Sequence, residues 1–533
     1  MTEETGARPT QFGKPISQDD DVVVVVGSGA GGGTIAHELT AKGIPVVVLE
    51  AGPYLRNEDY ENNEWQAFNQ MAWLDARTTS GSWRIAKDFP NLPAWIVKAV
   101  GGTTTHWSGA TPRFYEHEFR ARSTYGRVDG ANLLDWPITL DELAPWYAKA
   151  EDAIGSTHTG GRAPLPANNN YKVLAEGAKR AGYVHYSTGP YGTNAEPYDG
   201  RPASIQDGFN FQGDKNKSKW STMVREIPRA LETGLLDLRT ESHAVQVTHD
   251  VDGRADGVLY LDRDGNLQRQ RARVVVVAGN SIETPRLLLL SASSLFPDGL
   301  ANSSGQVGRN YMRHTTGSLY ARFDKPVRMY RGETTAGVIR DESGHNPSRG
   351  FVGGYFMETL SLGPAFLANF ADPGAWGKSF TSVLDAYENT AGMWIVGEDL
   401  PQESNRITLN RSVTDVNGLP VPNVHYDDHP NDAAMREHGY DRGTLLYEAV
   451  GAEHVHRTPP YPSTHNLGTA RMSERPEDGV VDRWGASHDV PNLFVGDGSV
   501  FTTSAAANPT LTIVALAMRQ ADYLASQLRA GEL

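Results

Sequence analysis

The 533-residue chain contains no cysteine, no run of five basic residues and no long apolar stretch. Without cysteine there is no disulfide, thiolate metal ligand or cysteine nucleophile, so redox chemistry would have to come from a bound cofactor. A formal net charge of -15 argues against a nucleic-acid or anionic-membrane partner. No stretch approaches the roughly 18 apolar residues of a spanning helix, and the first residues carry no signal-peptide pattern. We therefore expect a cytoplasmic protein that binds a small molecule.

A glycine-rich turn follows the first apolar run, DVVVVV at 21–26. Gly27 permits a sharp turn, Gly29 admits a pyrophosphate against the backbone, and Gly32 lets the following helix approach the sheet. The next strand, IPVVVLE, ends at Glu50, 18 residues after Gly32. A carboxylate there can accept hydrogen bonds from ribose hydroxyls, which favours FAD or NAD over a 2′-phosphorylated nucleotide. A glycine turn that arose by chance is the weaker alternative, because strand, helix and acid follow in order.

The remaining pattern predicts an α/β protein with two kinds of sheet. Residues 53–95 look like an excursion of loops and short helices, and 315–425 alternate short strands with glycine-rich loops. The second region indicates a mainly antiparallel sheet, flanked by helices, that covers one face of a pocket. The other predicted elements are helices over 139–153, 172–182 and 218–233, a strand over 236–247, hairpin turns at Asp252-Gly253 and Asp264-Gly265, and a central buried strand in RVVVVAG.

The last 40 or so residues predict a strand, a loop and a long helix that return to the first domain. A Rossmann-like nucleotide-binding domain would therefore be discontinuous in sequence. We assign 15–115, 215–315 and 460–533 to this domain, and 116–214 and 316–459 to the substrate-binding domain.

Four separated motifs resemble those of the glucose-methanol-choline (GMC) family of flavin oxidoreductases. They are the glycine turn at 27–32, AGNSIETPRLLLLS at 278–291, VGRNYMRH at 307–314, and GDGSVF with NPTLTI between 496 and 513. The resemblance spans the whole chain and implies FAD as cofactor and an alcohol as hydride donor. In addition, VGGTTTHWSGATPRF is similar to the segment that embraces the flavin in pyranose oxidases, and bacterial glycoside 3-oxidases are relatives of those enzymes.

The resemblance also implies individual contacts with FAD. His106 would lie at the dimethylbenzene edge of the flavin and bond covalently to its 8α carbon, although a buried histidine held by backbone hydrogen bonds is the alternative. Asp497 and Gly498 would contact the ribityl chain and a phosphate. Pro509 and Thr510 would begin a helix whose N–H groups point at the flavin pyrimidine ring. The other implied cofactor contacts are Gly102, Thr104, Trp107, Ser108, Val245 and Ala278.

Two residues match the active-site positions of the family. His465, in STHNLGTARM, would act as the base, since an imidazole can remove an alcohol proton near neutral pH. Asn508, in AANPTL, would hold the substrate oxygen through its amide. The expected reaction oxidises a secondary hydroxyl, at C2 or C3 of a pyranose sugar or of a C- or O-glycoside, to a ketone, and O2 would reoxidise the flavin to give H2O2.

Several alternatives stay open from the sequence. The enzyme could instead be a dehydrogenase with a quinone acceptor, or a non-redox flavoprotein similar to hydroxynitrile lyases. No metal site is expected, because no carboxylate motif accompanies His454 and His456. The oligomeric state is left open. An aromatic-rich group in the middle region could stack on a sugar or an aglycone, or could belong to the core; its members are Tyr355, Phe356, Phe366, Phe370 and Trp376.

Overall fold

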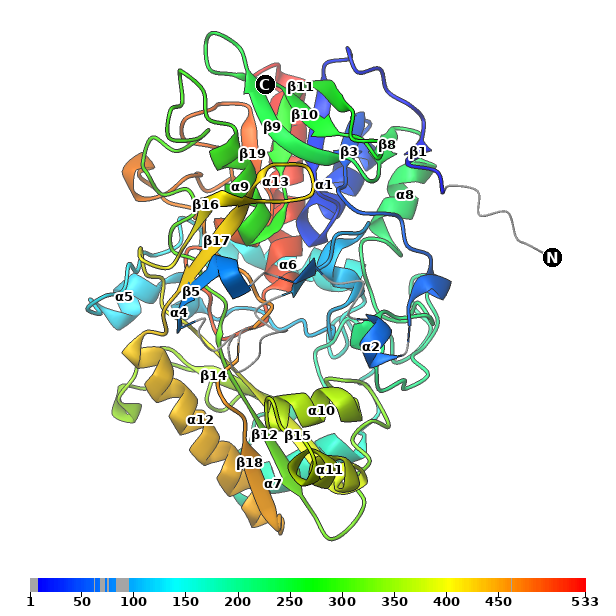
Figure 1. Cartoon of the computed structure of the whole chain (residues 1–533), viewed down its shortest axis with the longest axis vertical. Helices are drawn as coiled ribbons and strands as arrows, with labels where there is room; N and C mark the ends of the chain where they lie inside the picture. The colour runs from blue at the N-terminus through cyan, green and yellow to red at the C-terminus, as the bar shows by residue number, and fades with distance from the viewer. Residues whose placement is uncertain (1–7, 62, 68–71, 74–75, 83–94, 462) are drawn as a thin grey trace, which may run out of the picture.

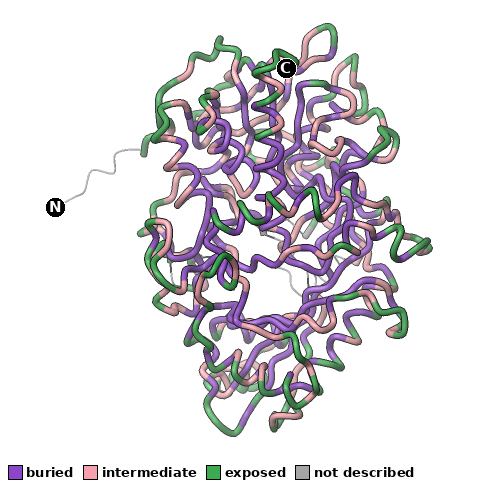
Figure 2. Tube along the Cα trace, turned by 180° about the vertical axis from the view of Figure 1, so that it is seen from behind, coloured by how far each residue is buried: buried purple, intermediate pink, exposed green. Residues whose placement is uncertain are grey.

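A computed structural model describes residues 8–61, 63–67, 72–73, 76–82, 95–461 and 463–533. Figure 1 shows two layered parts: one built around β2, β3 and β11, which also holds the C-terminus, and one built around β12, β14 and β15. Buried residues concentrate in the sheets and in the helix faces behind them, while exposed residues follow the peripheral loops (Figure 2). Part of the predicted excursion over 53–95 falls outside the described residues.

The first part contains an eight-stranded sheet of described residues, in the order β1-β8-β3-β2-β11-β10-β9, with β19 also paired to β11. The strands β2, β3, β8, β11 and β19 run parallel, and β1, β9 and β10 add antiparallel edges. This arrangement confirms the α/β fold class. The strands are β1 (Gln11–Gly13), β2 (Val22–Val26), β3 (Val46–Leu49), β8 (Leu236–Arg239), β9 (His243–His249), β10 (Ala255–Leu261), β11 (Leu267–Val277) and β19 (Leu493–Val495).

The valine run of β2 is apolar throughout because helices cover both faces of the sheet. Val23 and Val25 pack in one cluster with residues of α1 (Ala30–Ala41) and α8 (Glu226–Glu232). Val24 and Val26 pack in another, with residues of α6 (Leu140–Ile154) and α13 (Thr510–Ala530). A strand buried on both faces has no position for a polar side chain. The same reasoning holds for β11, which lies between β2 and β10 as its sequence predicts.

The second part is a six-stranded antiparallel sheet in the order β18-β12-β15-β14-β13-β7. Residues of the helices α7 (Asn169–Arg180) and α12 (Pro430–Ala449) pack against it in one apolar cluster. The predicted second sheet is therefore confirmed. Its strands are β7 (Tyr186–Ser187), β12 (Thr315–Arg322), β13 (Val338–Ile339), β14 (Tyr355–Thr359), β15 (Thr390–Gly397) and β18 (His454–Arg457).

Two predicted elements differ from the structure. The helix expected over 218–233 is confined to α8, because Thr222 donates its hydroxyl hydrogen to the carbonyl of Ser28 at 2.8 Å and anchors the preceding segment to the glycine turn. The strand expected over 236–247 is divided between β8 and β9. The chain turns at Glu241, whose φ is +51°, and leaves the parallel strands there.

None of the helices among the described residues has the length and apolar character that crossing a bilayer requires. The domain limits given above stay a prediction.

Candidate active site

A single continuous cavity connects the carboxyl ends of β2 and β3 with the six-stranded sheet. It brings together most residues expected to bind cofactor or substrate, from segments far apart in the sequence. Gly32 and Val245 do not line it, and Ala244 takes the wall position beside Val245. The predicted residues that line the cavity are Gly27, Gly29, Glu50, Gly102, Thr104, His106, Trp107, Ser108, Ala278, His465, Asp497, Gly498, Asn508, Pro509 and Thr510.

The glycines of the first turn have distinct geometric reasons. Gly27 has a φ of +97°, and a Cβ there would lie 2.4 Å from the carbonyl oxygen of Ala278. A Cβ on Gly32 would lie 2.1 Å from the carbonyl oxygen of Gly27, so this residue permits close packing. By contrast, a Cβ on Gly29 would meet only the Cα of Gly102, at 3.9 Å. Gly29 therefore opens onto the cavity, at the N-terminus of α1, where no side chain caps the backbone N–H groups.

Gly31 is a requirement that the sequence reasoning missed. A Cβ at this position would lie 1.7 Å from the carbonyl oxygen of Gly496, at the end of β19. The run of glycines in the turn gave a signal, but the close neighbour lies more than 400 residues further along the chain.

Glu50 lies buried at the end of β3, where the sequence places it. Its Oε2 accepts hydrogen bonds from the backbone N–H of Ser28 (3.1 Å) and from the Ser28 hydroxyl (2.6 Å), and its Oε1 accepts one from the N–H of Gly52 (2.9 Å). Burial raises the pKa of Glu50, and these hydrogen bonds oppose that rise. A carboxylate oxygen has two lone pairs, so Oε1 retains one for a ribose hydroxyl.

Asp497 already has a full set of partners within the protein. Oδ2 accepts from the N–H of Asn280 (2.8 Å) and the hydroxyl of Thr284 (2.6 Å). Oδ1 accepts from the N–H and the hydroxyl of Ser499, at 2.8 and 2.5 Å. In the structure this side chain joins α9 (Asn280–Leu290) to the segment that follows β19. Its contact with a flavin stays a prediction.

His106 is buried in the wall of the cavity. The hydroxyl of Thr105 donates to the carbonyl of Gly102 at 2.8 Å, and its oxygen lies 2.7 Å from Nδ1 of His106. Burial, with the charge of Lys219, lowers the pKa of His106 to about 3. The Lys219 ammonium itself donates to the Trp107 carbonyl at 2.5 Å. His106 is therefore neutral at physiological pH.

His465 faces a second buried histidine. Its Nδ1 lies 2.8 Å from Nδ1 of His314, and Nε2 of His314 lies 3.0 Å from the carbonyl oxygen of Ser504. Burial, reinforced by His314, lowers the pKa of His465 well below its ordinary value. The imidazole is therefore neutral at physiological pH, as a base must be before it accepts a proton.

Asn508 lies beside a buried acid. Its Nδ2 is 3.5 Å from Oε2 of Glu358, on β14, and burial raises the pKa of Glu358 to about 8. Glu358 is paired across the sheet with Trp394, on β15, whose ring lies 5.4 Å from that of His465. The six-stranded sheet thus contacts both residues of the predicted catalytic pair.

The middle-region aromatic residues divide between cavity and core. Phe366 and Phe370 line the cavity from α10 (Pro364–Ala371), while Tyr355 and Phe356 are buried in the sheet. Trp376 is 87% exposed and contacts neither region.

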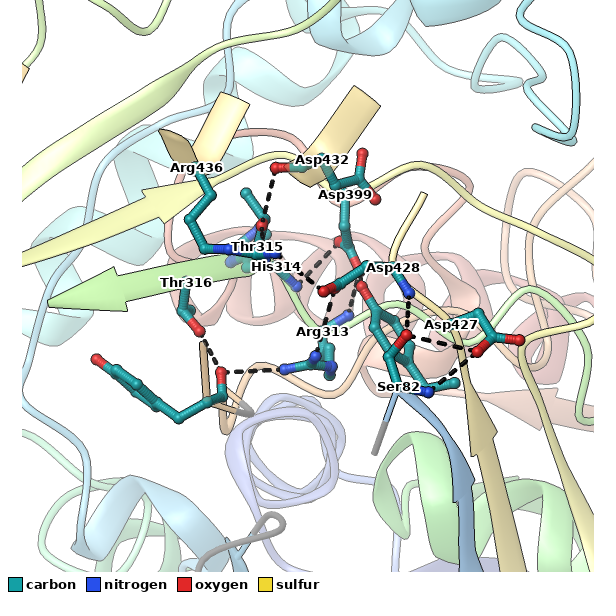
Figure 3. A network of polar contacts seen from close by, with 12 residues as sticks. Ser82, Arg313, His314, Thr315, Thr316, Asp399, Asp427, Asp428, Asp432 and Arg436 are labelled. Carbon is teal, nitrogen blue, oxygen red and sulfur yellow. Dashed lines mark hydrogen bonds and ion pairs between the residues drawn. The ribbon is translucent and has the colours of Figure 1, made fainter. Parts of the chain in front are cut away.

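A polar network lies directly behind His314 (Figure 3). Asp399 accepts the backbone N–H of Arg313 at 2.8 Å and that of His314 at 2.9 Å. The Arg313 guanidinium lies over the ring of Tyr426, 4.0 Å from its centre, and Asp428 lies between Arg313 and Arg436. In the sequence, His314 is marked only by its place in a family motif. Its contact with His465 spans 151 residues, which no local pattern reveals.

Comparison with known proteins identifies the family of the chain. Two models described as GMC oxidoreductase match residues 81–316 and 401–517. The chain belongs to the GMC oxidoreductase family. It is accordingly an FAD-dependent oxidoreductase that acts on CH–OH donors.

A 2-methyl-1,2-propanediol dehydrogenase from Mycolicibacterium austroafricanum is 34% identical, over 95% of this chain and 96% of the relative. A C-glycoside 3-oxidase from Microbacterium trichothecenolyticum is 32% identical, over 81% of this chain and 76% of the relative. A solved mutant formate oxidase from Aspergillus oryzae RIB40 superposes with a TM-score of 0.67 at 16% identity, over 97% of this chain and 100% of the other, which shows the shared fold. The diol dehydrogenase matches more of the chain than the glycoside oxidase does, so the narrower pyranose-oxidase subgroup stays a prediction.

Proposed function

We propose that this chain oxidises a secondary hydroxyl of a neutral substrate that carries an apolar or aromatic portion, with His465 as the base and Asn508 as the group that holds the substrate oxygen. The observation that carries the proposal is that the neutral imidazole of His465 and the amide of Asn508 line the same cavity, in contact with paired residues of one sheet, Trp394 and Glu358. Bound FAD would supply the hydride acceptor. The residues of this chain orient the hydroxyl and take its proton.

The apolar wall of the cavity supports this substrate class. Phe366 and Phe370 lie one helical turn apart on α10 and face the cavity together. Phe211 lies 5.7 Å from Phe366, and Tyr461 lies 4.9 Å from Phe370, between ring centres. A glycoside with an aromatic aglycone would place its ring against this wall and present C2 or C3 of the sugar to His465. This assignment also fits the resemblance of residues 100–114 to pyranose oxidases.

A small branched diol is the second candidate, because the 34%-identical relative is a dehydrogenase of 2-methyl-1,2-propanediol. Anaerobic bleaching of the flavin distinguishes the two. We would mix the holoenzyme separately with phenyl glucoside, glucose and 2-methyl-1,2-propanediol, and then admit air or a quinone. Fastest bleaching by the glycoside, with peroxide formed in air, would support a glycoside oxidase. The diol has a primary and a tertiary hydroxyl and no secondary one, so fastest bleaching by the diol would contradict oxidation of a secondary hydroxyl and favour a primary alcohol as substrate. Bleaching by none of the three would contradict both candidates.

His465→Ala tests the base. The variant should retain FAD and reduce it about 100- to 10,000-fold more slowly, the usual contribution of a general base. His454→Ala, which removes an exposed histidine outside the cavity, is the matched control and should behave as the wild type. Unchanged flavin reduction in His465→Ala would refute the proposed role.

A further proposal concerns the cofactor: a covalent bond between one ring nitrogen of His106 and the flavin 8α carbon. The bond would replace one C–H bond of the 8α methyl group, with loss of two protons in all, and the two electrons released would reduce the flavin until O2 or another acceptor reoxidises it. The position of the His106 ring in the wall of the cavity supports this attachment. Acid precipitation should leave the yellow colour in the protein pellet, and the mass of the intact chain should include FAD. In His106→Ala the colour should move to the supernatant. A colourless pellet from the wild type would show that the cofactor is bound without a covalent link.

A further inference from the structure

The hydrogen positions in the buried histidine pair follow from the acceptor at its far end. The carbonyl oxygen of Ser504 can only accept, so Nε2 of His314 carries a hydrogen and donates it at 3.0 Å. If His314 is neutral, its Nδ1 then has a lone pair and no hydrogen. The 2.8 Å contact between the two Nδ1 atoms therefore requires the hydrogen to sit on His465.

His314 is neutral because it is completely buried. Burial lowers its pKa, although Asp399 and the carbonyl of Ser504 oppose that effect. The neighbouring charges also largely offset one another, because two guanidinium groups face two carboxylates. Arg313 and Arg436 both lie within 4 Å of Asp428, and Asp399 accepts hydrogen bonds from the backbone of Arg313 and His314. His465, which packs against the other edge of the ring, is itself neutral.

The backbone at His314 is held in an unfavourable conformation. Its φ is +63°, in the left-handed region that residues with a side chain rarely adopt. The two hydrogen bonds that Asp399 accepts from consecutive backbone N–H groups stabilise this conformation. Asp399 is in turn tied to Ser504, whose hydroxyl accepts the Asp399 N–H at 3.0 Å. One small network thus fixes both His314 and the carbonyl that it contacts, and strain of this kind clusters at functional sites.

We propose that His314 is a positioning residue that keeps His465 in the tautomer with hydrogen on Nδ1, so that the lone pair of Nε2 faces the substrate hydroxyl. The inference rests on the proposed role of His465 as the base. During the reaction the alcohol proton moves to Nε2 of His465, and Nδ1 keeps its hydrogen bond to His314. Without an acceptor at Nδ1, His465 can place its hydrogen on Nε2 instead, and that form cannot accept a proton.

Two variants of nearly equal size test the inference in the holoenzyme. In His314→Gln the amide oxygen can accept from His465 and the amide nitrogen can donate to Ser504, whereas in His314→Met neither hydrogen bond forms. We expect His314→Met to reduce FAD about 10- to 100-fold more slowly, the usual loss when a supporting hydrogen-bond partner is removed. Substrate Kd and FAD content should change little, and His314→Gln should recover most of the rate.

The outcomes separate this inference from the proposed function. Equal rates in His314→Met and the wild type would overturn the positioning role, and so would equal losses in His314→Met and His314→Gln. If His465→Ala is slow at the same time, the role of His465 as the base still holds. A fast His465→Ala variant would overturn the base itself. If His314→Met does not fold, NMR spectra of the wild type labelled with 15N-histidine test the tautomer directly, with His465→Ala used to assign the signals. A hydrogen on Nδ1 of His465 supports the inference, and a hydrogen on Nε2 overturns it.

Discussion

At the scale of a single residue, we expect Glu358 to make the rate of flavin reduction depend on pH. Burial raises its pKa to about 8, so the carboxyl is neutral at pH 7 and ionises above pH 8. An anion would then lie beside the amide of Asn508 and compete for the hydrogen that should go to the substrate oxygen. We expect the rate of flavin reduction to fall as pH rises through about 8 in the wild type.

Glu358→Gln provides the matched comparison, because it keeps the shape of the side chain and removes the ionisation. Its rate of flavin reduction should stay level between pH 7 and pH 9.5, measured by stopped-flow absorbance. A decline of equal steepness in both proteins would assign the alkaline loss to another group.

The local sequence names some candidate active-site residues and misses the contacts of others. His465 and Asn508 lie in motifs that match the family, so the sequence alone was enough to propose them. Glu358 lies in no such motif, and His314 ends one without any sign of its contact, since the two residues lie 150 and 151 positions from the partners that they contact. Only the packing of β14 and β12 against the loops that precede α13 brings them together.

At the scale of elements, substitutions of Gly31 and Gly29 should affect different properties: the stability of the fold and the binding of the cofactor. In Gly31→Ala the new Cβ would lie 1.7 Å from the carbonyl oxygen of Gly496, so α1 has to move away from the end of β19. Gly29→Ala adds the same methyl group beside open space in the cavity. We expect Gly31→Ala to lower the free energy of unfolding by about 1–3 kcal/mol, the usual cost of overpacking.

Urea denaturation of the two apoproteins, followed by titration with FAD, measures both effects. Gly29→Ala should unfold at the same urea concentration as the wild type and bind FAD more weakly. Equal stability of the Gly31→Ala and Gly29→Ala apoproteins would contradict the close contact with Gly496.

Elements were predictable where burial on both sides of a sheet dictates an apolar run. β2 and β11 have this character, and both occupy central positions. The helix over 218–233 was predicted too long because helical periodicity does not report the anchor from Thr222 to Ser28. A tertiary hydrogen bond overrode local preference there.

For the whole molecule, FAD should act as part of the fold. The cavity is lined by segments from Val26 to Ile513, so a bound dinucleotide would connect both ends of the chain. A ligand that binds only the folded state adds about 2.7 kcal/mol of stability at 100 times its Kd. Protein prepared without flavin should therefore gain a higher Tm when FAD is added, as followed by tryptophan fluorescence. NAD at the same concentration is the control, and an equal rise with both nucleotides would contradict selective binding of FAD.

The sequence alone determined the glycine turn, the acid at the end of β3, the central strands and the two candidate active-site residues that match family motifs. These features depend on local geometry or on alternation of apolar residues over short segments. The tertiary structure decided which polar groups face one another: His314 against His465, Glu358 against Asn508, and Gly31 against Gly496. The reason is physical, because contacts between distant segments depend on how sheets and helices pack, and packing has no period that can be read along the chain.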